Sequence, residues 1–337
     1  LIYDGLIHSQ GKEKAALYAR ANSRAVEDYR SLVQSRNIQC RWLDCPAYLY
    51  TRCKRDVVEN EVRACDGLGL PVTFVTDTQL PFPVAGAAKV EGKVITTAGG
   101  DVTAEHIVFA GHFPFINRPG YYFARMHQDR SYCLALSGAG HMEGMYYGMD
   151  EGDYSFRGLR LEDKDLVILG GCNHRTGANE GGRYERLRNS ARSYWPDCKE
   201  EAAWSAQDCM TLDGVPYIGP YSSSTSNLYV ATGFNKWGMT SSMVSAMLLS
   251  DLVQGKTNPF AEVFSPSRTV LRPQLVVNGF EAAVGLLAPT TKRCPHMGCA
   301  LKWNSQEHTW DCPCHGSRFT KKGKCIDNPA TGDLTSC

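Results

Sequence analysis

The chain lacks three features that would place it in other classes of protein. It has no excess of charge of one sign, because 36 Lys and Arg oppose 35 Asp and Glu, giving a formal net charge of +1. No broad electric field therefore steers it toward nucleic acid or acidic lipid. Its longest apolar helix-like stretch, residues 243–253, contains Asp251 and is too short to span a bilayer. No basic-then-apolar leader opens the sequence, so we expect no secretion signal.

The length and the cysteines bound the organisation of the chain. Its 337 residues allow two or three domains, and its first residue is Leu1 rather than Met. We therefore expect a fragment, or a chain that lacks segments of its relatives. Eight of the 14 Cys are scattered through the first 210 residues. Scatter without dense spacing argues against a disulfide scaffold and is typical of a reducing cytoplasm, where we expect the protein to lie.

Hydrophobic periodicity predicts a mixed fold. Apolar residues at helical spacing predict helices over residues 12–37, 56–68 and 240–254, with Gly255 as a C-cap. Residues 90–94 are typical of a hairpin turn, and residues 107–110 of a buried strand. Further strands are predicted over residues 48–52, 132–136, 145–149, 154–161, 166–169 and 228–232. The middle region is therefore expected to form an antiparallel sheet, and the Pro- and Ser-rich residues 257–273 a linker.

A cluster of soft ligands near the C-terminus carries the most specific chemistry. Cys294-Pro-His296 is followed after fifteen residues by Cys312-Pro-Cys-His315. A C-x-H loop and a C-x-x-H loop supply what a [2Fe–2S] cluster needs when two Cys bind one iron and two His the other, as in a Rieske centre. Zinc is the alternative for two Cys and two His, although zinc fingers pair like ligands in each half of the motif. His308 is expected in an exposed loop, not as a ligand.

Residues 294–299 and 312–317 resemble the Rieske family, especially its respiratory and photosynthetic branch. The resemblance implies that Cys299 and Cys314 form a disulfide that ties the two cluster loops together. It also implies a hydrogen bond from Ser317 to a bridging sulfide, which stabilises the reduced cluster. High-potential members carry Tyr where this chain has Phe319. We therefore expect a lower potential, within the Rieske range of roughly −150 to +300 mV. Residues 328–332 resemble the Pro-containing loop that covers the cluster.

A second notable stretch covers residues 211–219 and 227–240. The pattern predicts a turn, followed by a strand that ends in a Gly-bearing loop at a helix N-terminus. Such a joint presents backbone N–H groups and a positive dipole end to an anion or an electron-rich ring edge. Gly233 and Gly238 permit close approach of the backbone to a flat ligand. The pattern alone also fits an ordinary strand–loop–helix joint.

This stretch is similar to the C-terminal signature of FAD-dependent oxidoreductases of the D-amino-acid oxidase type. In that family the loop lies against the isoalloxazine, and a bacterial subgroup carries a C-terminal Rieske domain. The resemblance implies cofactor-binding residues at Gly233, Phe234, Asn235, Lys236, Trp237, Gly238 and Met239. Residues 110–115 resemble the segment that passes the flavin nucleotide, and residues 1–33 the segment after the flavin fingerprint.

The chain departs from that family in one respect. It contains no G-x-G-x-x-G, so the pyrophosphate-binding turn is expected upstream of Leu1. The connections at residues 88–90 and 287–291 also look short for the family, which is consistent with omitted segments.

Substrate residues are only weakly indicated, and the catalytic residues stay unknown. Arginines and histidines on or beside the predicted middle strands are the candidates, because Arg can hold a carboxylate with two hydrogen bonds. Each is as well explained by a structural or surface role. The first candidates are Arg157, His174 and Arg175; Arg125, His127 and Arg130 are the others.

These patterns predict an α+β or α/β flavoprotein body with an antiparallel substrate-domain sheet and a small all-β Rieske domain. The expected domains are 1–256, N-terminally incomplete, 257–290 as linker and start of the next domain, and 291–337. The expected function is oxidation of a small amine, amino acid or related metabolite with FAD. Electrons would then leave singly through the cluster to an unknown acceptor that faces exposed His296 and His315.

Two other functions are weighed against this one. In the first, the protein is a Rieske electron carrier without substrate turnover of its own. In the second, it is a Rieske oxygenase, which needs a mononuclear iron held by two His and a carboxylate. No H-x-x-x-H with a downstream Asp occurs, so the oxygenase is disfavoured.

Overall fold

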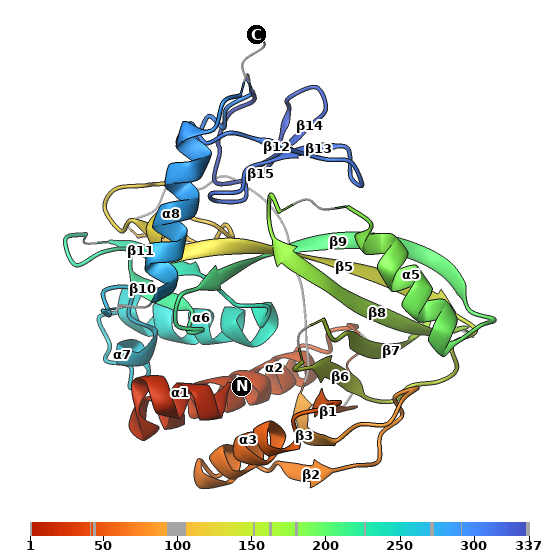
Figure 1. The fold of residues 1–337 in the computed structure, drawn as a ribbon. Helices are drawn as coiled ribbons and strands as arrows, with labels where there is room; N and C mark the ends of the chain where they lie inside the picture. Colours follow the sequence, from red (N-terminus) through yellow and green to blue (C-terminus); the bar gives the residue numbers. More distant parts are fainter. Residues whose placement is uncertain are drawn as a thin grey trace. The chain divides into compact units, whose positions relative to one another are not determined.

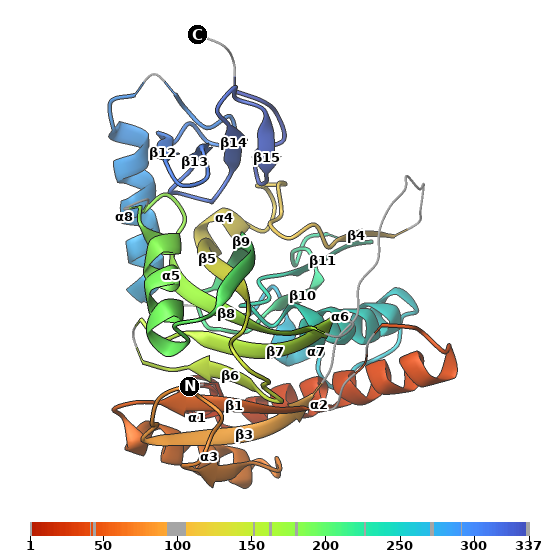
Figure 2. The ribbon, with the colours of Figure 1, turned by 90° about the vertical axis from the view of Figure 1, so that its right-hand side faces the viewer.

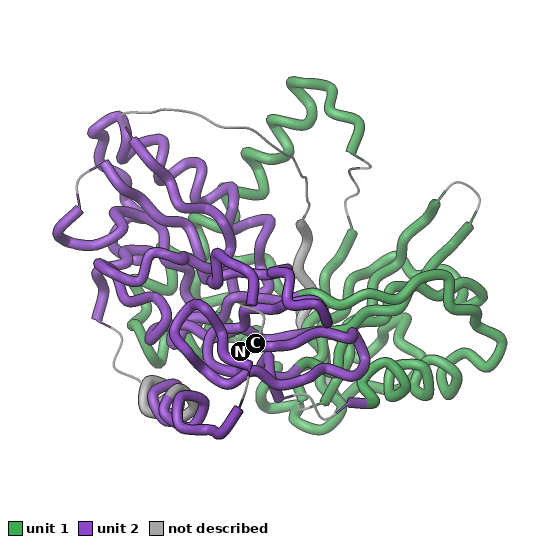
Figure 3. Tube along the Cα trace, turned by 90° about the horizontal axis from the view of Figure 1, so that it is seen from above, with its two compact units in different colours: residues 1–96, 131–173, 182–206 green, residues 97–130, 174–181, 207–337 purple. Residues whose placement is uncertain are grey.

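A computed structural model describes residues 2–40, 42, 45–92, 106–150, 152–161, 164–178, 181–225, 227–269, 273–290 and 292–334. The chain divides into two compact units (Figure 3). Unit 1 contains residues 1–96, 131–173 and 182–206, and unit 2 contains residues 97–130, 174–181 and 207–337.

Unit 1 begins with helices α1 (Tyr3–Gln10) and α2 (Lys12–Ser35), and α3 (Arg55–Gly67) follows after the first strand (Figure 1). Helices α2 and α3 confirm the predictions for residues 12–37 and 56–68. The carboxylate of Glu61 on α3 is 1% exposed and accepts hydrogen bonds from the backbone N–H groups of Ile2, Tyr3 and Asp4 at 2.9–3.2 Å. It thereby satisfies donors that the first turn of α1 leaves without intrahelical partners.

An eight-stranded sheet runs in the order β2-β3-β1-β6-β7-β8-β5-β9. The strands β6, β7 and β8 pair antiparallel, as predicted for the middle region, and β1 pairs parallel with β6. The bounds are β1 (Cys45–Thr51), β2 (Thr73–Val75), β3 (Gly86–Gly92), β5 (Met126–Ser137), β6 (Met145–Gly148), β7 (Ser155–Leu161), β8 (Lys164–Arg175) and β9 (Lys199–Thr211). Residues 90–92, predicted in a turn, belong to β3; residues 93–94 lie outside the described residues. Strands β5, β8 and β9 have residues in both units.

The core of unit 1 lies on one face of this sheet, under α5 (Arg183–Tyr194). Inward residues of the strands, such as Tyr132 and Phe156, pack with Leu187 of the helix. The rings of Tyr132 and Tyr184 meet edge to face with centroids 4.9 Å apart. Figure 2 shows α5 alongside the β8 region of the sheet.

Unit 2 contains a three-stranded sheet in the order β10-β11-β4, from β10 (Tyr217–Pro220), β11 (Leu228–Thr232) and β4 (Ile107–Phe109). Strand β11 and the following α6 (Gly238–Val253) match the predicted strand and helix. The prediction of a buried strand at residues 107–110 is wrong in its burial, because Ile107 is 55% and Val108 43% exposed. Strand β4 is an edge strand, and edge strands are covered less than central ones.

Residues 257–290, predicted as linker and start of the next domain, contain two helices: α7 (Ala261–Phe264) lies within the Pro- and Ser-rich part, and α8 (Pro273–Leu287) follows it. Arg268, between them, donates two hydrogen bonds to the buried carboxylate of Asp213, at 2.7 and 2.9 Å. Its guanidinium also bonds the carbonyl of Pro216 and lies 4.1 Å from the centroid of the Tyr217 ring. This residue therefore fixes the segment after α6 onto the turn before β10.

The C-terminal end of unit 2 is a four-stranded antiparallel sheet of β12 (Lys302–Asn304), β13 (Thr309–Asp311), β14 (Arg318–Thr320) and β15 (Cys325–Asp327). Its small core is rich in sulfur and includes Cys294, Cys312 and Phe319. The remaining short helix, α4 (Tyr122–Arg125), leads into β5. No helix in the described part of the chain is both long and apolar enough to cross a membrane.

Candidate metal centre and cofactor loop

Two short loops hold the predicted ligands, and each loop is closed by its own backbone. In the first loop, the N–H of Cys294 donates to the carbonyl of Cys299, and the N–H of Gly298 to that of Cys294. In the second, the N–H of Cys312 donates to the carbonyl of Ser317, and the N–H of Gly316 to that of Cys312. Gly298 and Gly316 both have positive φ, at 80° and 86°. The tight turns therefore need glycine at these two positions.

The loops bring the two histidines together. His296 Nδ1 and His315 Nδ1 lie 3.3 Å apart. Two nitrogens bound at about 2.0–2.1 Å to one tetrahedral ion would be separated by roughly this distance. His296 Nε2 lies 2.7 Å from Asn117 Oδ1, so Nε2–H donates and Nδ1 keeps its lone pair. The imidazole pair therefore fits one metal ion.

The two predicted cysteine ligands are buried and adjacent. Cys294 is 2% exposed and Cys312 is fully buried. A hydrogen bond from Cys312 lowers the pKa of Cys294 to about 7, while the same interaction and burial raise the pKa of Cys312. The pair thus gives up its first proton readily, and a metal ion would have to displace the second.

Burial keeps the imidazoles neutral, which is the form that binds metals. Desolvation lowers the pKa of His296 to about 4. Desolvation, followed by the charges of His296 and Arg175, lowers the pKa of His315 to about 3. Two neutral imidazoles and two buried thiols are the donor set of a Rieske cluster, so these residues fit the group that the sequence predicts.

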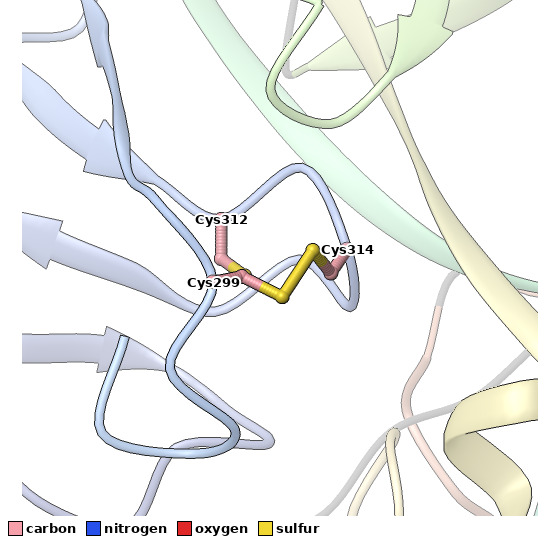
Figure 4. Close-up of side chains that lie close together, drawn as sticks. All are labelled: Cys299, Cys312 and Cys314. Atoms are coloured by element: carbon pink, nitrogen blue, oxygen red, sulfur yellow. A yellow bond between two sulfur atoms is a disulfide. The ribbon is translucent and has the colours of Figure 1, made fainter. Parts of the chain in front are cut away.

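A disulfide joins Cys299 and Cys314, the pair that the Rieske resemblance implies (Figure 4). Their sulfurs and that of Cys312 lie within 4.8 Å of one another. The three sulfurs are not a separate metal site, because disulfide sulfurs are not thiolates. Helix α8 lies directly against the bridge: a Cβ at Gly285 would stand 2.6 Å from Cys314 Sγ. The Gly285 carbonyl also accepts a hydrogen bond from the N–H of Ala300, at 2.8 Å.

Ser317 closes the second ligand loop and is fully buried. Its hydroxyl oxygen accepts the N–H of Ala330, at 2.9 Å, which ties the loop of residues 328–332 to the second ligand loop. Its hydrogen bond to Cys294 helps to lower the pKa of that thiol. Phe319, also fully buried, offers no donor.

The predicted exposure of the histidine edge is wrong for His315. This residue is only 4% exposed and His296 is partly buried. The segment between β4 and β5 covers them: the rings of Phe113 and Phe123 lie 6.5 and 5.8 Å from the His315 ring. An isolated motif gives no sign of this contact, because Phe113 and Phe123 lie far from the motif in the sequence.

The predicted flavin loop has an unusual backbone. Gly233, Asn235 and Lys236 have positive φ, at 71°, 48° and 70°. A Cβ at Gly233 would collide with the side chain of Thr211. The amide of Asn235 holds the loop in place, since its Oδ1 accepts the Thr211 N–H at 2.8 Å and its Nδ2 donates to the Gly233 carbonyl at 2.6 Å.

The loop leads into the first turn of α6, whose N-cap Trp237 makes no side-chain capping bond. Trp237 is 40% exposed, and Lys236 Nζ lies 3.7 Å from Asp208 Oδ2. Backbone donors at an uncapped helix start suit an electron-rich ring edge, so the loop fits the ring end of a flavin.

The substrate candidates have other contacts. Arg175 Nη1 donates to Asn278 Oδ1 on α8, at 2.9 Å, and His174 Nδ1 lies 2.8 Å from the Arg175 carbonyl. Arg157 is an exposed residue of β7 in unit 1. Arg130 forms two hydrogen bonds to Glu307. The Arg125 guanidinium lies 4.3 Å from the centroid of the Tyr217 ring.

Sequence reasoning missed Asn117, Gln128 and Gln207. A signal for Gln128 was present: it shares the alternating register of Met126 and Tyr132 on β5, whose members are buried. A polar residue at such a position requires a buried partner. No sequence signal identifies the partner.

The fold and the site together define a class of redox protein that joins a flavoprotein-type body to an iron–sulfur domain. A model of FAD dependent oxidoreductases matches residues 80–252, and a model of Rieske [2Fe-2S] domains matches residues 255–337. The chain belongs to the FAD dependent oxidoreductase family and carries a Rieske [2Fe-2S] domain. Its cofactors are accordingly FAD and a [2Fe–2S] cluster.

Individual relatives agree with this assignment. The protein YhfW of Bacillus subtilis, whose name describes it as a Rieske 2Fe-2S iron-sulfur protein, is 32% identical over 420 residues, covering 99% of this chain and 82% of YhfW. That alignment is longer than the 337-residue chain, so YhfW has inserted segments relative to it. The cytochrome b6-f complex iron-sulfur subunit of a Synechococcus strain is 42% identical over 60 residues, which are 18% of this chain and 33% of the subunit.

Solved structures are similar in fold. Glycine oxidase from Geobacillus kaustophilus has a TM-score of 0.60 at 18% identity, covering 76% of this chain and 84% of that enzyme. L-proline dehydrogenase from P. horikoshii has a TM-score of 0.56 at 14% identity, covering 74% of this chain and 82% of that enzyme. These likenesses confirm the predicted flavoprotein-type body.

Proposed function

We propose that this oxidoreductase oxidises a small amine, an amino acid or a related metabolite and passes the electrons singly to an acceptor. Conversion of an H–C–N–H group to C=N releases two electrons and two protons. When bound, FAD would supply the two-electron oxidation and the cluster the one-electron transfers. A one-electron acceptor would be reduced twice for each substrate, and the protons would pass to solvent. The names of glycine oxidase and L-proline dehydrogenase support an amine or amino-acid substrate.

In this proposal Cys294, His296, Cys312 and His315 hold the iron, and the disulfide of Cys299 and Cys314 braces the loops. The observation that carries it is the convergence of the two histidine Nδ1 atoms, 3.3 Å apart, beside two buried thiols.

The loop of residues 233–239 would hold the flavin ring, with the uncapped start of α6 favouring negative charge on it. The amide of Asn235 would keep the loop in its positive-φ conformation. We place the oxidoreductase domain at 1–256, the connecting segment at 257–290 and the Rieske domain at 291–337. Arg157, His174 and Arg175 stay weak candidates for substrate contact. A cytoplasmic location completes the proposal, in keeping with the scattered free cysteines.

Analysis of iron, acid-labile sulfide and flavin in the purified protein tests this function, followed by anaerobic addition of candidate amines and amino acids. Bleaching of the flavin by one of them, with appearance of the reduced-cluster EPR signal, is the expected result. A cluster-containing protein without flavin, or one whose flavin no amine reduces, would favour the second candidate, an electron carrier without substrate turnover.

A further inference from the structure

The outer edges of both predicted imidazole ligands lie against residues of the same chain. Asn117 Oδ1 accepts the Nε2–H of His296 at 2.7 Å. The rings of Phe113 and Phe123 surround His315, with Phe123 meeting it edge to face at an interplanar angle of 86°. All of these residues belong to unit 2. The segment from 111 to 123, called here the covering segment, therefore occupies the side of the site from which the histidines could be reached.

The amide side chains of Gln128 and Gln207 fasten the ligand loops to this part of the fold. Gln128, 2% exposed, donates from Nε2 to the carbonyls of His315 at 2.7 Å and Asn328 at 3.3 Å. Gln207 Nε2 donates to Gln128 Oε1 at 2.6 Å and to the Gly316 carbonyl at 2.8 Å. The two amides thus satisfy three carbonyls of the cluster loops, and a buried amide such as that of Gln128, with its partners in place, specifies one arrangement.

The loop of residues 328–332 donates hydrogen bonds to the covering segment in turn. Asn328 Nδ2 donates to the carbonyls of Gly111 at 2.6 Å and Phe113 at 3.0 Å. Hydrogen bonds in both directions across one contact make sliding of the two parts costly, because a shift would break all of them, and the bond from Gln128 to the His315 carbonyl is buried.

Two glycines make the contact this close. A Cβ at Gly316 would stand 2.7 Å from the side chain of Gln128, and a Cβ at Gly177 would stand 2.5 Å from Pro313 Cα. Both glycines also have positive φ, at 86° and 84°. A loosely docked domain would leave room for side chains at these positions.

We propose that the imidazole edge of the cluster site is an internal contact, closed by the covering segment, and that Asn117 is the positioning residue for His296. An external acceptor therefore cannot dock on this edge and takes electrons at another face. On the proposed function, on which this inference rests, each of the two electrons released per substrate crosses the contact singly. The substrate is oxidised, the one-electron acceptor is reduced twice, and the protons go to solvent.

Chemical accessibility of the histidines tests the contact. The cluster-loaded protein is treated with diethyl pyrocarbonate, and the modification rate of each histidine is followed by mass spectrometry. His141, whose side chain is 52% exposed, is the internal reference. We expect His296 and His315 to react at least about tenfold more slowly than His141, the factor that corresponds to a local opening of about 1.4 kcal/mol.

Variants separate the covering contact from other causes of slow reaction. Asn117→Ala should accelerate modification of His296 several-fold and leave His141 unchanged, while Asn117→Asp, which keeps an acceptor oxygen, should retain the slow rate. Asn189→Ala, on the exposed surface of α5, is the matched control.

Pulsed EPR of the reduced protein should show that Asn117→Ala changes the nitrogen hyperfine couplings of one imidazole ligand only. A purely structural role of Asn117 would not produce that change.

Rapid modification of His296 in the wild-type protein, at the rate of His141, would overturn the proposal. So would an Asn117→Ala variant with an unchanged His296 rate and unchanged hyperfine couplings. Accessibility can be measured whether or not flavin is bound, and even if no amine is oxidised. The accessibility experiment can therefore fail while the proposed function stands, and the reverse also holds. The proposed function is tested separately, by metal, sulfide and flavin analysis.

Discussion

Arg130 on strand β5 of the large sheet and Glu307 in the turn between β12 and β13 form an ion pair with two hydrogen bonds. Their side chains are 3% and 13% exposed, and a second guanidinium, that of Arg318, bonds the same carboxylate at 2.9 Å. Arg318 also bonds Asp311, which is fully buried. The pair therefore extends a buried charge network of the C-terminal sheet to β5.

Arg130→Met should destabilise the C-terminal sheet, because it leaves Glu307 buried with one cation instead of two. Breaking a buried pair costs about 3–5 kcal/mol, and we expect the lower end because Arg318 remains. Hydrogen exchange of the amides in β13 and β14 measures this local stability. Arg188→Met is the control: its pairs with Glu185 and Glu200 are reached by solvent, with side chains 29%, 58% and 32% exposed, so the change should be within about 1 kcal/mol. Equal effects of the two variants would contradict the account.

The buried pair of Asp213 and Arg268 predicts a dependence on pH. Burial alone would raise the pKa of Asp213, but the hydrogen bonds and charge of Arg268 lower it below the ordinary value of 3.8. A carboxyl with a lowered folded-state pKa stabilises the fold above its unfolded value, and this contribution disappears as the pH falls through the folded value.

The stability difference between wild type and Asp213→Asn should therefore be constant at neutral pH and shrink only as the pH falls below about 3.8. Urea unfolding at a series of pH values measures it. A difference that begins to shrink near neutral pH would show that Asp213 is not held ionised by Arg268.

Two glycines of α8 should respond oppositely to the same substitution. Alanine favours a helix over glycine by about 1 kcal/mol. At Gly279 nothing lies within 4 Å of a new Cβ, so Gly279→Ala should stabilise the protein. At Gly285 the Cβ would meet Cys314 Sγ at 2.6 Å, and overpacking costs about 1–3 kcal/mol. Gly285→Ala should therefore destabilise, as thermal unfolding would show. Stabilisation by both variants would mean that α8 does not lie against the disulfide.

Ser317→Ala should lower the midpoint potential of the cluster. The variant removes a hydroxyl that bonds Cys294, and such a donor favours the reduced, more negative form. A preference of about 1.4 kcal/mol corresponds to about 59 mV for a one-electron couple, so we expect a fall of that order. The variant also leaves the buried N–H of Ala330 without its acceptor. Ser305→Ala, in an exposed turn nearby, should leave the potential unchanged in redox titrations followed by EPR.

Local features of the fold were predictable, and long-range ones were not. The periodic apolar pattern predicted α2 and α3, and short apolar segments bounded by Gly and Asp predicted β7 and the central part of β8, because each signal depends on residues close in sequence. Helix α8 was missed although Val277, Val284 and Leu287 recur at helical spacing. These side chains are 45%, 47% and 84% exposed, whereas the described positions of α8 that contact the rest of unit 2 include Asn278 and Gly285, which an apolar pattern does not single out.

The ligand motif was predictable for the same local reason, whereas its surroundings were not. Spacing alone brings Cys294 and His296 into one loop. The contact of His296 with Asn117 joins residues 179 positions apart, and that of Gln128 with His315 joins residues 187 apart. Such pairings depend on how the strands and loops pack, which a single sequence does not contain.

Iron, sulfide and EPR measurements on wild type and His315→Cys test the central claim most directly. The account predicts two irons and two acid-labile sulfides per chain, and a reduced-state spectrum with the mean g value of clusters that have two histidine ligands. His315→Cys should lower the potential and change that spectrum. Zinc in place of iron, or a spectrum that the substitution leaves unaltered, would contradict it.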